Sequence, residues 1–431
     1  MAARGTGARR AAVALLHGVL VERRMLSELT AGAGAPLARL APAERARAQA
    51  LALGVLRNLT ALDAVLAAFL DRPPPPKAQH ALRVAAFELL VEGAPAHGVV
   101  NAAVEILRGG RRGGHLAGLV NAVARRLADE GAELWQAQPP QPLPGWLAKP
   151  VARHFGAAAV TAIAAAHRRG AAVDLSLKAP GTAAEWARRL AAEILPTGSL
   201  RLRGPAQVSA LPGFAEGAWW VQDAAAAVPV RLLGDVAGQE VLDLCAAPGG
   251  KTMQLAAAGA RVSALDISEP RLRLLRQNLE RTGLAAEVVV ADALGWRPGR
   301  RFDAIVLDAP CSATGTIRRH PDLPFVKAGT DLSGLFALQA GLIDAALELL
   351  KPGGRLIYCT CSLLPREGES QVEAALTRHP GLAVLPPDAP GMGLEPGWVT
   401  AEGGVRLRPD YWAGRGGMDG FYIAALRAPE P

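Results

Sequence analysis

The chain has 431 residues and a formal net charge of +8, and half of its residues are apolar, 20% are charged and 4% are aromatic. This composition excludes a wholly disordered or collagen-like chain and predicts two or three domains; because no stretch of 18 apolar residues lacks a charge, no transmembrane helix is expected. The positive surplus lies within residues 1–222 and suits a phosphate backbone, although an arginine-rich composition alone would also produce it.

The first 130 residues are predicted to be helical, because apolar residues recur there at positions i, i+3 and i+4. A short apolar run behind several arginines, residues 11–20, superficially resembles a signal peptide. His17 interrupts this run and charged residues follow it at helical spacing, which favours an amphipathic helix in a soluble, cytoplasmic protein. The predicted helices cover residues 11–20, 41–56, 62–70, 80–90, 99–107 and 116–127.

A Pro/Gln-rich segment, residues 136–144, is the clearest domain boundary. It separates a helical domain (residues 1–135) from a small mixed α/β region (145–222), which precedes a larger domain (223–431). In that last part, predicted strands (residues 241–244, 261–265, 287–290, 304–307 and 355–358) alternate with predicted helices (252–258, 270–281 and 332–350). This alternation predicts a parallel, doubly wound sheet that binds ligands at the carboxyl ends of its strands.

The first of these strands runs into a glycine-containing turn in the sequence VLDLCAAPGGKT. Pro248, Gly249 and Gly250 form a tight turn where the backbone can approach a ligand closely. A loop for nucleoside triphosphates is the alternative, but that motif needs glycine where this chain has Cys245.

Aspartates stand at the ends of the next three strands, namely Asp266, Asp292 and Asp308. A single aspartate at such a position is usually a helix cap or a turn residue. Three aspartates at successive strand ends after a glycine turn are a more specific sign of a ligand site, because they can bind the ribose and base of an adenosyl group. Without a polyphosphate loop, the ligand that fits best is S-adenosylmethionine.

The four cysteines lie between residues 245 and 361, and each is inside a motif. Their spacing argues against a disulfide framework and against a zinc site. We therefore expect thiol chemistry in a reducing compartment, and we expect no metal site. Cys311 and Cys361 follow two strands near Asp308 and are candidates for a reactive pair. Cys245 and Cys359 are read as small buried apolar residues.

The segments PCSATGT and TCS, which follow LDLCAAPGGKT, resemble the ribosomal RNA cytosine-5 methyltransferases of the Sun/Fmu (RsmB-like) group. The resemblance runs in order from Gln222 to Ile423. The N-terminal part resembles the helical RNA-binding NusB fold at ALGVLRN, HGVVNAAVEIL and LVNAVARRL. This domain order narrows the resemblance to bacterial enzymes that act on 16S ribosomal RNA. Transfer RNA is the alternative substrate, and a non-catalytic RNA-binding assembly factor is the alternative class.

The resemblance implies catalytic roles for four residues. Cys361 would be the nucleophile that adds to cytosine C6, and Cys311 would assist release of the adduct. Asp308 would lie between the cofactor and the cytosine, and Lys251 would belong to the same catalytic group. The implied substrate is 16S ribosomal RNA or a small-subunit assembly intermediate, and the implied enzyme is a monomer that needs neither membrane nor metal.

The resemblance also implies an S-adenosylmethionine site. Asp266 would hold the ribose, Asp292 the adenine, and Asp308 would border the cofactor. The methionine part would be wrapped by Cys245, Ala246, Ala247, Pro248, Gly249, Gly250 and Lys251.

Three features depart from the pattern or extend it. The sequence Lys178-Ala179-Pro180 replaces Arg-Val-Asn, which puts one RNA contact in doubt, and Cys359 stands where alanine is frequent. Behind the Cys311 loop, Arg318, Arg319 and His320 are candidate contacts to RNA phosphates, with an ordinary solvated loop as the alternative.

Overall fold

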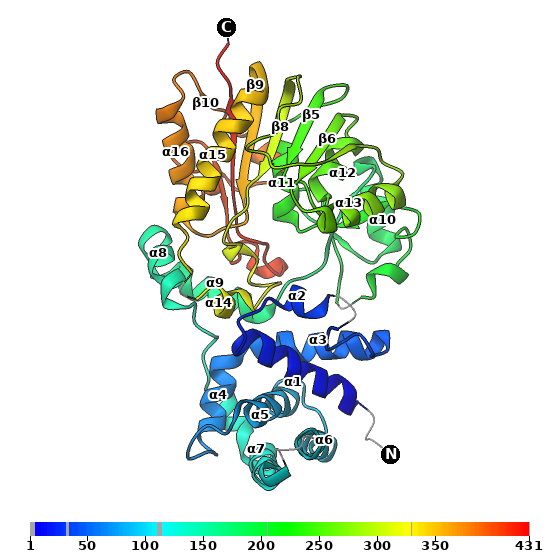
Figure 1. Ribbon diagram of the computed structural model, residues 1–431, viewed down its shortest axis with the longest axis vertical. Helices are drawn as coiled ribbons and strands as arrows, with labels where there is room; N and C mark the ends of the chain where they lie inside the picture. Colours follow the sequence, from blue (N-terminus) through cyan, green and yellow to red (C-terminus); the bar gives the residue numbers. More distant parts are fainter. Residues whose placement is uncertain (1–4, 32–33, 110–113, 205, 329, 431) are drawn as a thin grey trace. The chain divides into compact units, whose positions relative to one another are not determined.

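The computed structural model describes residues 5–31, 34–109, 114–204, 206–328 and 330–430. The chain forms two compact units, Met1–Gly170 with Ile317–Gly329 and Ala171–Thr316 with Thr330–Pro431. The first unit is helical and the second contains both sheets (Figure 1), so the expected fold class is confirmed.

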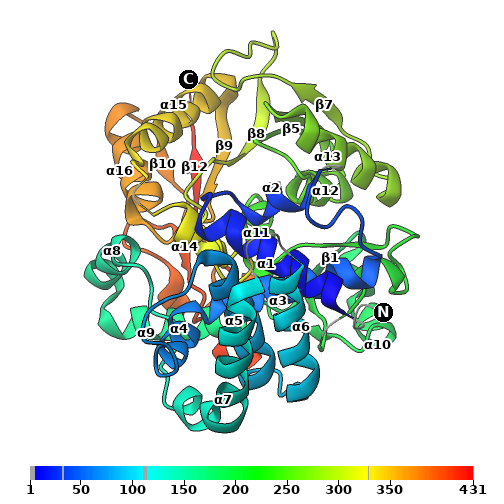
Figure 2. The same cartoon turned by 60° about the horizontal axis from the view of Figure 1, so that its bottom comes forward.

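The helices of the first unit surround a single apolar core, in which Leu15, Leu51 and Leu62 are fully buried. Figure 2 shows several of these helices packed side by side. Among the described residues, no single helix is long and apolar enough to cross a membrane. The helices α3 (Pro42–Arg57) and α4 (Leu59–Ala67) would together have the length and composition of a membrane span, but they meet at a bend of 75°. The helices are α1 (Thr6–Leu20), α2 (Leu26–Thr30), α3 (Pro42–Arg57), α4 (Leu59–Ala67), α5 (Pro76–Leu90), α6 (Ala96–Arg108), α7 (Ala117–Gln136), α8 (Gly145–Phe155) and α9 (Ala157–Arg169).

A buried carboxylate fixes the packing of three of these helices. Glu88 on α5 is fully buried and binds Arg9 of α1, whose Nε lies 2.6 Å from Glu88 Oε2. Arg47 of α3 binds the same carboxylate at 2.8 Å. Because a buried carboxylate is costly unless it is paired, these contacts favour one arrangement of the three helices.

The first unit also contains a segment that lies far along the sequence. Residues 317–329 include α14 (Leu323–Val326), and Phe325 of this helix packs against the helical core. Asp322 Oδ2 accepts a hydrogen bond of 2.8 Å from Leu26 N. Arg318 is 0% exposed, so its side chain is not available for the expected contact with RNA phosphates, whereas Arg319 and His320 are exposed.

The large sheet of the second unit has the strand order β10-β12-β9-β8-β5-β6-β7, with β11 paired to β12. The five strands from β5 to β9 are parallel, as predicted. The last three strands pair antiparallel, which the alternation of strands and helices did not predict. The bounds are β5 (Glu240–Leu244), β6 (Arg261–Asp266), β7 (Glu287–Val290), β8 (Phe302–Asp308), β9 (Leu350–Thr360), β10 (Ala383–Val384), β11 (Val405–Leu407) and β12 (Phe421–Arg427).

Helices cover both faces of this sheet because successive strand residues point to opposite sides. On β8, Ile305 and Leu307 pack in the core that contains α15, while Ala304 and Val306 pack in the core that contains α11 and α12. Strand β8 is therefore buried on both faces, as its continuous apolar sequence predicts, whereas no residue of the edge strand β7 is fully buried. The helices of this unit are α10 (Ala183–Arg189), α11 (Ala224–Leu232), α12 (Gly250–Ala257), α13 (Glu269–Thr282), α15 (Ser333–Leu349) and α16 (Glu369–Arg378).

A small antiparallel sheet precedes the large one in the sequence, with the strand order β2-β3-β1-β4. Its buried centre includes Trp219 and an ion pair in which Arg201 binds both oxygens of Asp174 at 2.7 Å. The expected mixed region therefore contains this sheet, while its first two helices, α8 and α9, belong to the first unit. The strands are β1 (Asp174–Leu177), β2 (Glu193–Ile194), β3 (Leu200–Arg201) and β4 (Trp219–Val221).

Candidate active site

The order of the parallel strands brings the candidate residues to one edge of the sheet. Strand β5 lies between β6 and β8, so the direction of winding reverses between β5 and β8. In the register of the sheet, Leu244 pairs with both Leu265 and Leu307. The residues that follow these positions, Cys245, Asp266 and Asp308, consequently lie at neighbouring strand ends, where doubly wound folds bind ligands.

The glycine turn after β5 has the tight geometry that its sequence predicts. Gly249 caps α12 with a φ of 104°, and a Cβ atom at this position would lie 2.9 Å from Leu275 Cγ. Cys245 also has a positive φ, of 62°. Only glycine fits at residue 249 without moving a neighbour, so the backbone of the turn stays close to the strand ends.

Lys251 and Asp308 form an ion pair at the centre of the site. Lys251 is 7% exposed, and its Nζ lies 2.7 Å from Asp308 Oδ2. Burial lowers the pKa of Lys251, but the Asp308 charge and further negative groups outweigh burial, so the net pKa is raised. The other Asp308 oxygen lies 3.7 Å from Cys359 Sγ.

The two other aspartates differ in their surroundings. Asp266 is buried and accepts hydrogen bonds from Ala247 N at 3.1 Å and Ser268 N at 2.9 Å, with Arg271 at 3.4 Å. An ionised carboxylate has about four acceptor sites, so Asp266 can accept further hydrogen bonds from a ligand. Asp292 is exposed just beyond β7 and accepts from Leu294 N at 3.0 Å.

The two candidate reactive thiols lie next to each other. Cys311 follows β8, Cys361 follows β9, and their Sγ atoms are 3.4 Å apart. Both residues are half-buried, and no cysteine of the described chain is in a disulfide. The hydrogen bond to Cys361, together with burial, raises the pKa of Cys311 well above its usual value. Cys311 therefore keeps its proton and can share it with Cys361.

The loop of Cys311 depends on a close approach between two glycines. A Cβ atom at Gly315 would lie 2.0 Å from the carbonyl oxygen of Gly420. Gly315 N donates to Cys361 O at 2.9 Å, and Gly420 N donates to Gly315 O at 2.9 Å. This explains why the ATGT and DGFY segments both need glycine there, and it joins the two cysteine loops through the backbone.

The remaining two cysteines differ in exposure, because Cys245 is half-buried like the reactive pair and only Cys359 is buried, whereas the sequence predicts burial of both. Cys359 is fully buried, and burial raises its pKa well above the usual value. Burial also raises the pKa of Cys245, to about 12. Both therefore stay as thiols, which fits their interpretation as small apolar residues better than a reactive role.

Asp243 is a buried ionisable residue of the site that sequence reasoning missed. It is 0% exposed on β5; Thr252 Oγ1 donates to its Oδ2 at 2.6 Å, and its Oδ1 has no hydrogen-bond partner in the described part of the chain. Burial raises its pKa to about 7, against the lowering effects of Thr252 and Lys251. The sequence did carry a signal, because Asp243 interrupts a run of apolar residues on a strand that is buried on both faces, and a charged residue there must point into a core.

This raised pKa predicts how stability depends on pH. The folded protein holds the Asp243 proton more tightly than the unfolded chain does, so this residue should lower the free energy of unfolding as pH rises from about 4 to about 7. Asp243→Asn removes the titration. The unfolding free energy of the variant relative to wild type should increase by up to about 4 kcal/mol across that pH range. Calorimetric melting at several pH values tests this, and a difference that does not change with pH would contradict it.

Comparisons with known proteins agree with the two-unit organisation. Residues 230–427 match the family model described as 16S rRNA methyltransferase RsmB/F, and residues 6–129 match the NusB family. The chain is 37% identical to ribosomal RNA small subunit methyltransferase B of Xanthomonas campestris, over 99% of this chain and 98% of the relative. It is 36% identical to the protein of the same name from Vibrio cholerae, over 90% of each. The crystal structure of PH0851 shares the fold, with a TM-score of 0.73, 23% identity and 99% coverage of both chains.

Proposed function

Since the chain belongs to the RsmB/F family of 16S rRNA methyltransferases, we propose that it transfers a methyl group from S-adenosylmethionine to C5 of one cytosine in 16S ribosomal RNA. The observation that carries the cytosine-5 chemistry is the pair of thiols 3.4 Å apart, at the strand ends that also hold the Lys251–Asp308 ion pair. A methyltransferase that methylates an exocyclic nitrogen or a ribose oxygen has no need for two thiols, because those atoms are nucleophiles themselves.

The chemistry requires a covalent step because C5 of cytosine is a poor nucleophile. The Cys361 thiolate forms a bond to C6, and the displaced electron pair makes C5 carbanion-like while N3 is stabilised by a hydrogen bond or a proton. After C5 has taken the methyl group, a base removes the C5 proton. The electron pair of that C–H bond re-forms the C5–C6 double bond, and the bond between C6 and the Cys361 sulfur breaks. Cys311, which keeps its proton beside Cys361, is placed to assist this release.

Asp308 would contact the cytosine ring in this scheme. Lys251 binds one of its oxygens at 2.7 Å, and the other, which has a 3.7 Å contact with Cys359 Sγ, can accept a hydrogen bond from the exocyclic amine of the base or from N3 once N3 carries a proton. Lys251 thereby orients the carboxylate as well as neutralising part of its charge. A base stacked in a helix cannot enter such a site, so the target cytosine is unpaired or flipped out.

The residues at the strand ends fit an S-adenosylmethionine molecule. Gly249 lets the turn pack against Leu275, where a Cβ would collide, and the Asp266 carboxylate, which binds two backbone N–H groups and Arg271, has about one acceptor site left for a ribose hydroxyl. The turn from Cys245 to Lys251 would hold the methionine part, and Asp292 the adenine. When bound, the cofactor would supply an electrophilic methyl group.

The RNA preference follows from the first unit. A NusB-like helical domain with a positive surplus would supply affinity for an RNA backbone, and the family model that matches residues 230–427 is described as a 16S rRNA methyltransferase, so we propose ribosomal RNA, in the cytoplasm, as the substrate. A monomer is sufficient, because both cysteines and the cofactor residues lie in one unit of one chain.

Methyl transfer from labelled S-adenosylmethionine to protein-free 16S ribosomal RNA, followed by nucleoside analysis, tests this function. We expect a single 5-methylcytidine in 16S ribosomal RNA and none in transfer RNA. Incorporation into transfer RNA alone would overturn the substrate but keep the chemistry. A methylated nucleoside other than 5-methylcytidine would overturn the chemistry.

A further inference from the structure

The buried carboxylate of Glu367 lies behind the two reactive cysteines. Glu367 ends the short 3-10 helix Pro365–Glu367 and is 0% exposed. Its Oε1 accepts hydrogen bonds from Ser312 N at 2.8 Å and from Gln339 Nε2 at 3.1 Å. Its Oε2 accepts from the hydroxyls of Ser362, at 2.5 Å, and of Ser312. Four donors therefore satisfy a carboxylate that would otherwise be costly to bury.

The donors to this carboxylate come from both cysteine loops. Ser312 directly follows Cys311, and Ser362 directly follows Cys361. The main-chain oxygen of Glu367 is fixed as well, because Tyr358 and Thr360 on β9 donate to it at 2.8 and 3.0 Å. One residue thus binds the loop after β8, the loop after β9 and the end of β9 itself.

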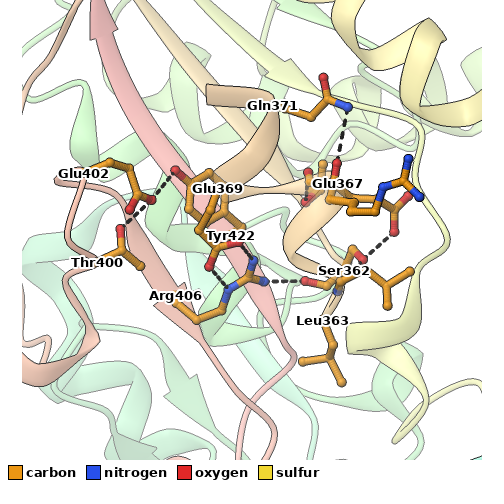
Figure 3. A network of polar contacts seen from close by, with 12 residues as sticks. Ser362, Leu363, Glu367, Glu369, Gln371, Thr400, Glu402, Arg406 and Tyr422 are labelled. Carbon is orange, nitrogen blue, oxygen red and sulfur yellow. Dashed lines mark hydrogen bonds and ion pairs between the residues drawn. The ribbon is translucent and has the colours of Figure 1, made fainter. Parts of the chain in front are cut away.

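A second contact holds the Cys361 loop from the other side (Figure 3). Arg406 on β11 donates to the carbonyl oxygen of Ser362 at 2.5 Å and binds both oxygens of Glu369, at 3.0 and 2.5 Å. Between the two glutamates, a Cβ at Gly368 would lie 2.5 Å from Arg406 Nη2. The sequence Glu-Gly-Glu therefore lets one carboxylate face the cysteine loops while the next one pairs with Arg406.

We propose that Glu367 is a positioning residue that ties the Cys311 and Cys361 loops together and so sets the distance between their two sulfurs. Serine hydroxyls and a backbone N–H hold a loop only when an acceptor meets them in a fixed place, and Glu367 provides that acceptor to both loops at once. The proposal deepens the proposed function, because its consequence for turnover rests on covalent catalysis by Cys361.

Two substitutions separate the reach of this side chain from its charge. Glu367→Gln keeps the length: its oxygen can still accept from Ser312 N and Gln339, and its amide can donate to the serine hydroxyls, which can reverse their roles. Glu367→Asp keeps the charge but is one methylene shorter, so it cannot reach both loops. A positioning role predicts that the glutamine variant stays within about threefold of wild-type kcat, whereas the aspartate variant loses about 100-fold with little change in KM.

A readout independent of methylation measures the distance between the thiols. Phenylarsine oxide binds two neighbouring thiols together, so its rate of capture reports whether Cys311 and Cys361 stay adjacent. We expect capture to be slowed about tenfold in Glu367→Asp and to be unchanged in Glu367→Gln. Glu402→Asp is the matched control: Glu402 accepts from Tyr422 and Thr400 at 2.7 Å in the same region (Figure 3), without a hydrogen bond to either cysteine loop.

Each result decides between positioning and the alternatives. Normal capture and normal kcat in Glu367→Asp would overturn the proposal. A kcat lost equally in Glu367→Gln and Glu367→Asp, with normal capture in both, would also overturn it and indicate that the charge of Glu367 takes part in proton transfer. If wild type makes no 5-methylcytidine but capture is slowed only in Glu367→Asp, the proposed function fails while the positioning role stands.

Discussion

Cys361→Ala should abolish methyl transfer, lowering kcat by roughly a factor of 10⁴ or more, because without the nucleophile C5 of cytosine is never activated. Binding of S-adenosylmethionine should change by less than about twofold, since the proposed cofactor residues lie in the turn after β5 and at the ends of β6, β7 and β8. Calorimetric titration of the cofactor and a single-turnover methylation assay measure the two quantities on the same preparation.

Cys359→Ala is the matched control for this experiment. Cys359 lies two residues earlier, near the end of β9, is fully buried, and is in a position where alanine is frequent in the family that the sequence resembles. It should keep most of the activity. Parallel loss of cofactor affinity and turnover in Cys361→Ala would show that Cys361 supports the cofactor site and would contradict the nucleophile assignment.

Cys311→Ala should trap a covalent complex between the protein and its RNA. The Cys361 adduct can still form and accept the methyl group, but release is slowed when the neighbouring thiol is gone. We expect turnover to fall by roughly 10² to 10⁴, the range that a positioned proton-transfer group supplies. The adduct should appear as a band of low mobility on a denaturing gel, stable to heat and detergent.

The double variant Cys311→Ala/Cys361→Ala provides the control for that band, which it should lack. A covalent band in Cys361→Ala, together with none in Cys311→Ala, would mean that the two cysteines have exchanged roles. Both assignments are geometrically possible, because the sulfurs are 3.4 Å apart and either thiol is close enough to donate a proton to the other. The covalent band therefore decides which cysteine is the nucleophile.

The sequence predicted the parts of the site that lie on parallel strands. Asp266 and Asp308 end strands and Cys245 follows one, and the alternation of strands and helices predicts that these strands are parallel, so that their ends share one edge of the sheet. The order of the strands was not predicted. The family resemblance then assigned roles to Cys311 and Cys361. The antiparallel pairing of β12 to β9 was not predictable this way, because an apolar strand carries no sign of its direction.

Long-range contacts account for what the sequence did not reveal. In the sequence, Glu367 looks like an ordinary charged residue of a loop. The four groups that donate hydrogen bonds to its carboxylate lie up to 55 residues away along the chain. Likewise, nothing local to Arg318 indicates that its segment joins the helical unit, where Arg57 donates to its carbonyl oxygen at 3.0 Å. Its neighbours Arg319 and His320 remain candidates for RNA contact.

The central claim is that Cys361 bonds to the cytosine that receives the methyl group. The most direct test incubates the wild-type protein and S-adenosylmethionine with 16S ribosomal RNA that contains 5-fluorocytidine. Fluorine at C5 cannot leave as a proton does, so the adduct should persist after methyl transfer. Nuclease and trypsin digestion followed by mass spectrometry should find one methylated fluorocytidine nucleotide on the peptide spanning residues 356–366, at Cys361. Attachment at Cys311, or methylated RNA with no attached peptide, would contradict the account.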